Sequence, residues 1–586
     1  MTLTSRSLTS TSKGYTRGGT ARRARTVLRA ATAALGVALV ATACASANGR
    51  SSSAGELTAT GGKRGGTLNV LMQSDFEHLD PQRIYVAMAL NADRLLTRPL
   101  TTYKAVPGIH GTDAVPDLAE SYTHSPDCKD WTFRLRPGLK YEDGSPIRAA
   151  DVKYGVERSF DDEISDGPQY AKQYIVGGDT YKGPYKDTSP QGLRGIEVQG
   201  DDTIVFHLVK TVCDYNYTVA FPLFSPLPKA KDTRDQLDNH PFSSGPYRVQ
   251  TYDRGQQLVL VRNPHWDKAN DPVRGAYPDK IVFQFGLDAS IINQRLITDQ
   301  GPDQTSITLD TNVTPAFLTK VMSDPGVKRR TISGSGPAVW YVAINTAKQK
   351  NQAVRKALNF ATSREQVRAG CGGQVCGQYA TGITSPSLPS YDPQENLYHI
   401  PPTGDINKAR QILQAAGVKT PVTLTMAYPN YDKGVTAFTA LQQAWERDNL
   451  FRIIPQPIPR KSFYSTVGQP QLEPDLVYVG WSADWPSGST VLPPLFDGRQ
   501  IVSRGNQNLT QLNVPEINKA MDEAAAETNF AKQQQMWAHV EDLVLRQDVI
   551  VPLRYDQVVQ LFGSRVRGAY LHFFYGSFDI ASLSVV

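Results

Sequence analysis

The chain has 586 residues, 40% of them hydrophobic and 20% charged, which excludes an intrinsically disordered protein and predicts two lobes, or one domain with a large insertion. The formal net charge of +6 arises in residues 1–43, which hold seven Lys or Arg and no acid. Without these seven, the chain has 55 basic and 56 acidic residues. The rest of the chain therefore lacks the excess of positive charge that nucleic-acid binding requires.

Residues 1–43 have the pattern of an export signal. An Arg-rich start is followed by an apolar run over residues 30–43, which is too short to span a bilayer. Ala41-Thr42-Ala43-Cys44 resembles a lipobox, with Ala41 where Leu is usual. We therefore expect a signal peptide over 1–43, a lipid on Cys44, and a protein anchored on the outer face of the cell membrane. The alternatives are an ordinary signal peptide and, from Arg22-Arg23, export by the twin-arginine route.

Residues 44–64 are rich in Ser, Gly, Ala and Thr, a composition typical of a flexible tether. We expect ordered structure from near Gly66. Residues 66–72 are apolar or β-branched and bounded by glycine, which predicts a strand.

The segment from residue 131 to 160 has the periodicity of a strand at its start and that of a helix at its end. Trp131, Phe133 and Leu135 alternate with polar residues, as in a half-buried strand. Pro137-Gly138 and Asp143-Gly144 predict two turns with a second strand between them. Helical spacing of apolar residues over 149–160 then predicts a helix.

Further helices and strands alternate along the rest of the chain. Apolar residues share one helical face over 406–416 and again over 536–544, and we expect both faces to be core. Strands are predicted at 280–285, 422–426 and 476–479. The class is therefore mixed α/β, with no fixed-period repeat.

Four cysteines remain after Cys44, an even number that predicts disulfides in an exported chain. Cys371 and Cys376 close a short Gly-rich loop, which favours a local bridge and leaves Cys128 to pair with Cys213. The sharper alternative is a metal site, but the chain has no CxxC motif and no matching His spacing. We expect no metal and no cofactor.

Catalytic motifs are missing from the sequence. There is no G-x-S-x-G, H-E-x-x-H, P-loop or G-x-G-x-x-G following a strand, and the nine His residues are scattered. We therefore expect a binding protein and not an enzyme.

Several segments occur in the order in which they are found in one known family. They are residues 116–121, 131–138, 141–152, 244–247 with 262–266, Asn345 with 354–358, 408–417, and 480–486. Together they resemble the family 5 extracellular solute-binding proteins, which include the oligopeptide and dipeptide receptors. The resemblance covers nearly all of the chain after residue 65.

The resemblance implies a two-lobed periplasmic-binding-protein-like fold of type II, cluster C, with a hinge between the lobes. By analogy, lobe I takes residues 65–333, with an extra subdomain at about 109–224. Lobe II takes residues 334–551, and residues 552–586 return to lobe I. The expected protein is a monomer that works with ABC permease and ATPase subunits.

The resemblance also implies an extended peptide ligand whose ammonium group is held by an Asp, here Asp484. Trp481 and Trp485 flank it, and Tyr341 and Asn345 begin the second lobe, so these five are the candidate ligand-binding residues. The alternatives are that Asp484 caps a helix or braces the hinge and that the tryptophans are core. Nickel chelates, oligosaccharides or opines are alternative ligands, and a peptide-sensing lipoprotein without transport is an alternative function.

Overall fold

The computed structural model describes residues 62–164, 167–187, 189–393, 397–459 and 462–586. The expected signal peptide, Cys44 and most of the expected tether lie outside these residues. Within them, none of the helices combines the length and the apolar character that a membrane crossing requires.

The first sheet has five strands in the order β11-β1-β10-β9-β8. Its strands are β1 (Thr67–Leu71), β8 (Tyr247–Asp253), β9 (Gln257–Arg262), β10 (Lys280–Gln284) and β11 (Ser306–Ile307). β1 runs parallel to β10 and β11, whereas β10, β9 and β8 are antiparallel. The strands predicted at 66–72 and 280–285 are thus confirmed as β1 and β10.

A second, antiparallel sheet has the order β4-β5-β7-β6. Its strands are β4 (Ala119–His124), β5 (Asp130–Leu135), β6 (Ile196–Gln199) and β7 (Thr203–His207). Trp131, Phe133 and Leu135 are all buried, which confirms the half-buried strand that their alternation predicts.

The segment after β5 forms both predicted turns but not the strand between them. Gly138 and Gly144 have φ of 74° and 85°, the left-handed region that glycine adopts without strain. Between the turns, only an isolated bridge joins Lys140 to Pro146. The predicted second strand was wrong because two closely spaced turns leave no room for a ladder, and Pro146 has no amide hydrogen to donate.

Fifteen α-helices are interspersed with the strands along the described part of the chain. They are α1 (Ala87–Asp93), α2 (Ala149–Arg158), α3 (Tyr170–Tyr174), α4 (Tyr215–Thr218), α5 (Ala289–Thr298), α6 (Pro315–Ser323), α7 (Pro325–Lys328), α8 (Gln352–Ala361), α9 (Arg364–Gly370), α10 (Ile406–Ala415), α11 (Asp432–Trp445), α12 (Phe463–Val467), α13 (Leu492–Phe496), α14 (Pro515–Ala526) and α15 (Phe530–Leu545), a count for the described residues alone. The predicted helices are confirmed as α2, α10 and α15.

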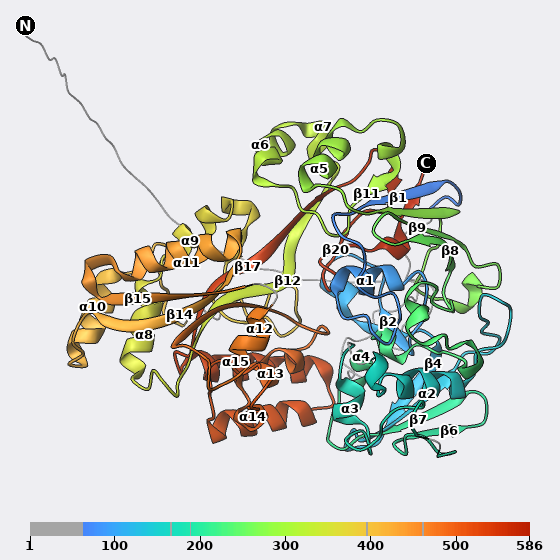
Figure 1. Cartoon of the computed structure of the whole chain (residues 1–586), viewed down its shortest axis with the longest axis horizontal. Coiled ribbons are helices and arrows are strands. Elements are labelled where there is room, and N and C mark those ends of the chain that lie inside the picture. Colours follow the sequence, from blue (N-terminus) through green and yellow to red (C-terminus); the bar gives the residue numbers. More distant parts are fainter. Residues whose placement is uncertain (1–61, 165–166, 188, 394–396, 460–461) are drawn as a thin grey trace, which may run out of the picture. The chain divides into compact units, whose positions relative to one another are not determined.

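The third sheet has six strands in the order β13-β17-β12-β16-β14-β15. They are β12 (Thr331–Ile344), β13 (Gly377–Tyr379), β14 (Val422–Asn430), β15 (Phe451–Pro459), β16 (Leu476–Ser482) and β17 (Ile550–Leu561). β14 is parallel to β15 and β16, and the other neighbours are antiparallel. β12 and β17 are the two long strands that run beside each other in Figure 1. β14 and β16 confirm the strands predicted at 422–426 and 476–479.

Both faces of the six-stranded sheet are covered by helices. On β12, Tyr341 and Ala343 join a buried cluster that includes residues of α15, whereas Val342 and Ile344 join a cluster that includes residues of α11. Successive side chains of a strand point to opposite faces. The uninterrupted apolar run of β12 is therefore explained by burial on both faces.

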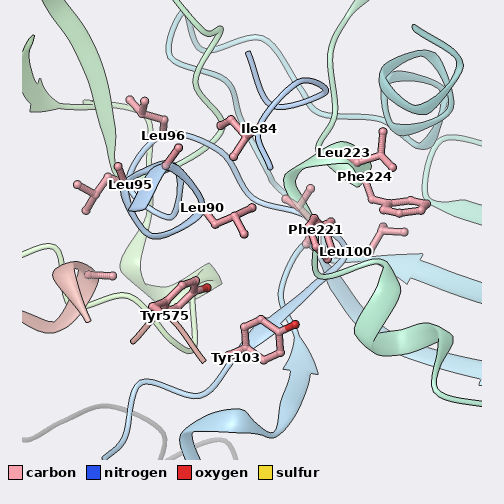
Figure 2. Close-up of a cluster of buried hydrophobic side chains, with 14 of the residues drawn as sticks. Ile84, Leu90, Leu95, Leu96, Leu100, Tyr103, Phe221, Leu223, Phe224 and Tyr575 are labelled. Carbon is pink, nitrogen blue, oxygen red and sulfur yellow. The ribbon is translucent and has the colours of Figure 1, made fainter. Parts of the chain in front are cut away.

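The largest buried cluster gathers residues from distant parts of the chain. Figure 2 shows Leu90 of α1, Tyr103, Phe221 and Tyr575 among its members. Three small sheets have two strands each: β2 (Thr101–Tyr103) with β3 (Ala114–Pro116), β18 (Val566–Arg567) with β21 (Ser584–Val585), and β19 (Leu571–His572) with β20 (Ser577–Phe578). Trp485, which follows β16 of the six-stranded sheet, also belongs to this cluster.

The four described cysteines form two disulfides. Cys128 is joined to Cys213, and Cys371 to Cys376, with 85 and 5 residues of sequence separation. Among the described residues, no group of three His, Cys, Asp or Glu side chains is placed to hold a metal ion.

Candidate ligand-binding site

Strand β16 leads directly to Asp484 and has an unpaired edge. One edge pairs with β12 along its length, from Leu476 opposite Ile344 to Ser482 opposite Ala338. On the other edge, β14 pairs only with Leu476 and Val477. Residues 479–482 therefore have no second partner among the described strands, and such an edge is a template for an added strand.

The carboxylate of Asp484 is half-buried and is held by two tyrosine hydroxyls. Tyr170 of α3 donates a hydrogen bond to it, and Tyr85 donates a second. Burial raises the pKa of Asp484 to about 6, although the two hydrogen bonds act to lower it. Among the described residues, no Lys, Arg or His side chain lowers the pKa of Asp484. Asp484 is therefore a desolvated acid without a counter-ion.

Trp485, the next residue, is fully buried with 0% exposure. Its ring lies edge-on to Tyr170 at 4.7 Å between centroids and packs against Phe221 at 6.3 Å. Its Nε1 donates to the carboxylate of Asp214 at 3.2 Å. No face of the ring is exposed to a ligand, so this placement is that of a packing residue.

Asp214 connects this segment to the first disulfide. It is 3% exposed and follows Cys213 in the chain. Besides Trp485, it accepts a hydrogen bond from the Oγ of Ser489 at 2.5 Å. A second contact lies close by in sequence, where Tyr217 stacks on Phe530 with centroids 4.7 Å apart. Residues 213–217 and 485–489 are thereby joined through polar and aromatic contacts.

Trp481 lies on β16 and is half-buried. Its Nε1 donates to the carbonyl oxygen of Thr490 at 3.0 Å, and its ring packs on the cluster that covers one sheet face. The side chain of Trp481 therefore holds the backbone at Thr490 in place, while part of its ring stays exposed.

Tyr341 and Asn345 do not join the group around Asp484. Tyr341 is 2% exposed within the cluster on one sheet face. Asn345 accepts from the amides of Ala347 and Lys348 at 3.0 and 3.3 Å and donates to Glu473 at 3.3 Å. Trp481 pairs with Val339 of β12, and Asn345 directly follows the end of β12, about 20 Å from Val339 at the rise of a strand.

A hollow of about 360 Å³ opens beside Tyr85. Val86 and Met88 line it together with Tyr85, and Glu77 adds an acid. Tyr85 and Val86 are 46% and 47% exposed, so the wall of this hollow presents apolar surface to solvent. The partner of Asp484 therefore also borders open space.

Sequence reasoning missed Tyr85, Tyr170, Asp214 and Ser489. No motif marks them, because the contacts from Tyr170 to Asp484 and from Asp214 to Trp485 span 314 and 271 residues of sequence. The only local signal is the density of tyrosines near residue 170.

A family model matches most of the chain. Bacterial extracellular solute-binding proteins, family 5, match residues 113–502, which includes Asp484, the unpaired edge of β16 and the first disulfide.

Two relatives and one solved structure extend this similarity. The probable D,D-dipeptide-binding periplasmic protein DdpA of Escherichia coli is 25% identical over 486 residues, 80% of this chain and 85% of that protein. Heme-binding protein A of Haemophilus influenzae is 25% identical over 484 residues, 78% and 82% of the two chains. The solved clavulanic acid biosynthesis oligopeptide binding protein 2 is 31% identical with a TM-score of 0.84, covering 89% of this chain and 96% of its own.

Proposed function

Because the chain belongs to the bacterial extracellular solute-binding proteins of family 5, we propose that it captures peptides outside the cell for an ABC importer. The observation that carries the proposal is Asp484, a desolvated carboxylate without a cation, at the end of an unpaired strand edge. An extended peptide with a free amino terminus has the chemistry that complements both features.

The backbone of the peptide is proposed to pair with the free edge of β16. Amide and carbonyl groups at residues 479–482 have no second strand partner among the described residues. A peptide strand added there gains main-chain hydrogen bonds that are independent of its side chains. Binding of many sequences with similar affinity follows from this mode.

The ammonium group of the peptide is proposed to bind Asp484. Taking a charged amine out of water is costly unless a carboxylate compensates it. Tyr170 and Tyr85 already orient the carboxylate, so little ordering remains to be done when the amine arrives. In this proposal Trp485 fixes the neighbouring backbone, Trp481 walls the site with its exposed part, and Tyr341 and Asn345 support β12.

The lobes proposed from the sequence, 65–333 with 552–586 and 334–551, meet at β12 and β17. These two strands are hydrogen-bonded to each other, with a break in register between Ser335 and Val339. They are the proposed hinge. Delivery of the captured peptide to a permease and its ATPase is the proposed next step.

Blocking the amine tests the proposed ligand class. Purified protein is titrated by calorimetry with a short peptide and with the same peptide acetylated at its amino terminus. The free peptide is expected to bind at least about 30-fold more tightly, because acetylation removes the charge that Asp484 compensates. Equal affinities would contradict the proposal and favour a ligand without an amine.

Native mass spectrometry of the protein as purified separates peptides from the alternative ligands. Retained masses that fragment as peptides support the proposal. A retained nickel chelate, oligosaccharide, opine or porphyrin would overturn it.

A lipid on Cys44 is the proposed membrane anchor, and it predicts a specific mature mass. Membrane-extracted protein should begin at Cys44 and carry a diacylglyceryl group, because two or more acyl chains are needed for stable anchoring. Intact-mass analysis checks this. Cys44→Ala is expected to release the protein into the medium or to block its cleavage, and an unmodified start at another residue would contradict the proposal.

A further inference from the structure

The indole ring of Trp340 lies across Gly480 on one face of the six-stranded sheet. Trp340 of β12 pairs with Gly480 of β16. A Cβ atom placed on Gly480 would meet three atoms of the ring at 3.0, 3.1 and 3.2 Å, closer than most Cβ contacts in proteins. The missing side chain at residue 480 therefore lets the ring reach from β12 over β16.

The edge of β16 that faces away from β12 is open at this point. Gly480 and Trp481 are partly exposed and Ser482 is exposed. Among the described residues, 479–482 make no backbone–backbone hydrogen bond outside the ladder to β12. Because successive side chains of a strand point to opposite faces, Gly480 shares the face of Trp340, whereas Trp481 lies on the other face. A peptide strand added to this edge would place every second side chain on the face of Trp340.

The ring of Trp340 takes the place that a side chain at residue 480 would have beside such a strand. Side chains directly opposite each other on neighbouring strands have Cβ atoms about 5 Å apart, and aromatic rings reach farther. Gly480 has no Cβ atom to offer, and the indole that covers it is partly exposed. A ligand side chain opposite Gly480 would therefore contact the indole of Trp340.

Two charged groups already lie against this ring and decide which side chain it suits. The guanidinium carbon of Arg554 is 5.2 Å from the ring centroid, and the Nε1 of Trp340 donates to the carboxylate of Asp556 at 3.3 Å. Arg554 and Asp556 also form an ion pair with each other. A cation of the ligand would be repelled by Arg554, and an anion would meet the negative face of the ring. Tyr478 stacks on the indole with centroids 5.2 Å apart, so the ring already packs as an aromatic partner.

We propose that Trp340 is a specificity-determining residue that contacts an aromatic side chain of the bound peptide at the position opposite Gly480. The inference rests on the proposed peptide function and deepens it by naming one side-chain class. The preference is confined to one position, because the neighbouring side chains of an added strand point to the other face of the sheet. It adds to main-chain pairing, which is independent of the peptide sequence.

Calorimetric titration of the full protein with tetra-alanine, and with its variants that carry one Phe or one Lys at each position in turn, tests the proposal. At one position, Phe is expected to bind about three- to tenfold more tightly than Ala, the range that an aromatic pair contributes. Lys at that position should bind no more tightly than Ala. Trp340→Leu keeps an apolar side chain but loses the ring, and it should bind the Phe and Ala peptides equally.

Two further variants separate contact with the ligand from a role in folding. Trp340→Phe keeps an aromatic ring and should retain part of the preference. Gly480→Ala leaves Trp340 in the chain, but its methyl group would displace the ring and should reduce the preference. Each variant is judged by the ratio of its affinities for the Phe and Ala peptides, which does not depend on how much of the sample is folded.

The outcomes distinguish this inference from the proposed function. If peptides bind but Phe is not preferred at any position, or if Trp340→Leu keeps the full preference, the role of Trp340 is overturned and peptide capture stands. Tighter binding of Lys than of Phe at the preferred position would also overturn it. If none of the peptides binds the wild type, the proposed function fails, and this inference fails with it.

Discussion

Replacing Asp484 by Asn weakens the binding of an unmodified peptide by about 30-fold to several thousand-fold. Loss of one partner of a buried, hydrogen-bonded charge pair costs roughly 2–5 kcal/mol, which corresponds to that range of affinity. Asn has the size of Asp and still accepts hydrogen bonds from Tyr170 and Tyr85, so the fold should be retained. Calorimetry gives the affinity, and circular dichroism checks the fold.

Asp522→Asn is the matched control for this variant. Asp522 is an exposed acid paired with Arg499, and its loss should leave peptide affinity unchanged. The acetylated peptide supplies a second control, because it should bind wild type and Asp484→Asn with similar affinity. If Asp484→Asn binds the free peptide as tightly as the wild type does, the amine is held elsewhere.

The affinity for a free peptide should also depend on pH through Asp484. Its pKa is about 6 without ligand, above the usual value for Asp, so the acid takes up a proton as the pH falls through 6. The ammonium binds only the ionised form, and affinity should decline below pH 6 by up to about tenfold per pH unit. Above about pH 8 the peptide amine itself loses its charge. Asp484→Asn should lack the decline at low pH.

Replacing Trp485 by Ala lowers the free energy of unfolding by about 3–5 kcal/mol, the usual cost of truncating a buried Trp. The ring is fully buried against Tyr170 and Phe221, and its Nε1 satisfies the buried carboxylate of Asp214. Truncation therefore leaves both a cavity and a weakened polar network. Guanidinium denaturation followed by circular dichroism measures the change.

Trp481→Ala is the comparison variant for Trp485→Ala. Trp481 also donates its Nε1, to Thr490, but it is only half-buried and should cost less to truncate. Trp485→Phe separates the two contributions, since it keeps most of the packing against Tyr170 and removes the hydrogen bonds from Nε1 to Asp214 and Ser489. A loss below about 1 kcal/mol for Trp485→Ala would mean that the contact is not maintained in solution.

Much of the fold follows from local patterns of the sequence. Trp131, Phe133 and Leu135 form a strand where their alternation predicts one, and the family and its two-lobed α/β class are confirmed by the match over residues 113–502. The strand predicted between Gly138 and Gly144 failed because pattern alone does not show whether two turns leave space for a ladder.

The site is less accessible to sequence reasoning than the fold. Asp484 was found because it sits in a recognisable segment, but its partner Tyr170 lies 314 residues away. The role of Trp485 is decided by Asp214, 271 residues away. Asn345 illustrates the opposite case, since it belongs to a recognisable segment yet follows the end of β12, far from Trp481. Which residues meet across such distances is decided by tertiary packing.

The disulfide between Cys128 and Cys213 also affects when the site can be completed. Cys213 precedes Asp214, so the bridge to Cys128 adds a covalent constraint to the backbone that presents this acid to Trp485 and Ser489. Disulfides persist in oxidising compartments and not in the cytoplasm. If the chain is exported as proposed, this constraint on the backbone beside Trp485 is added only after translocation, in an oxidising compartment.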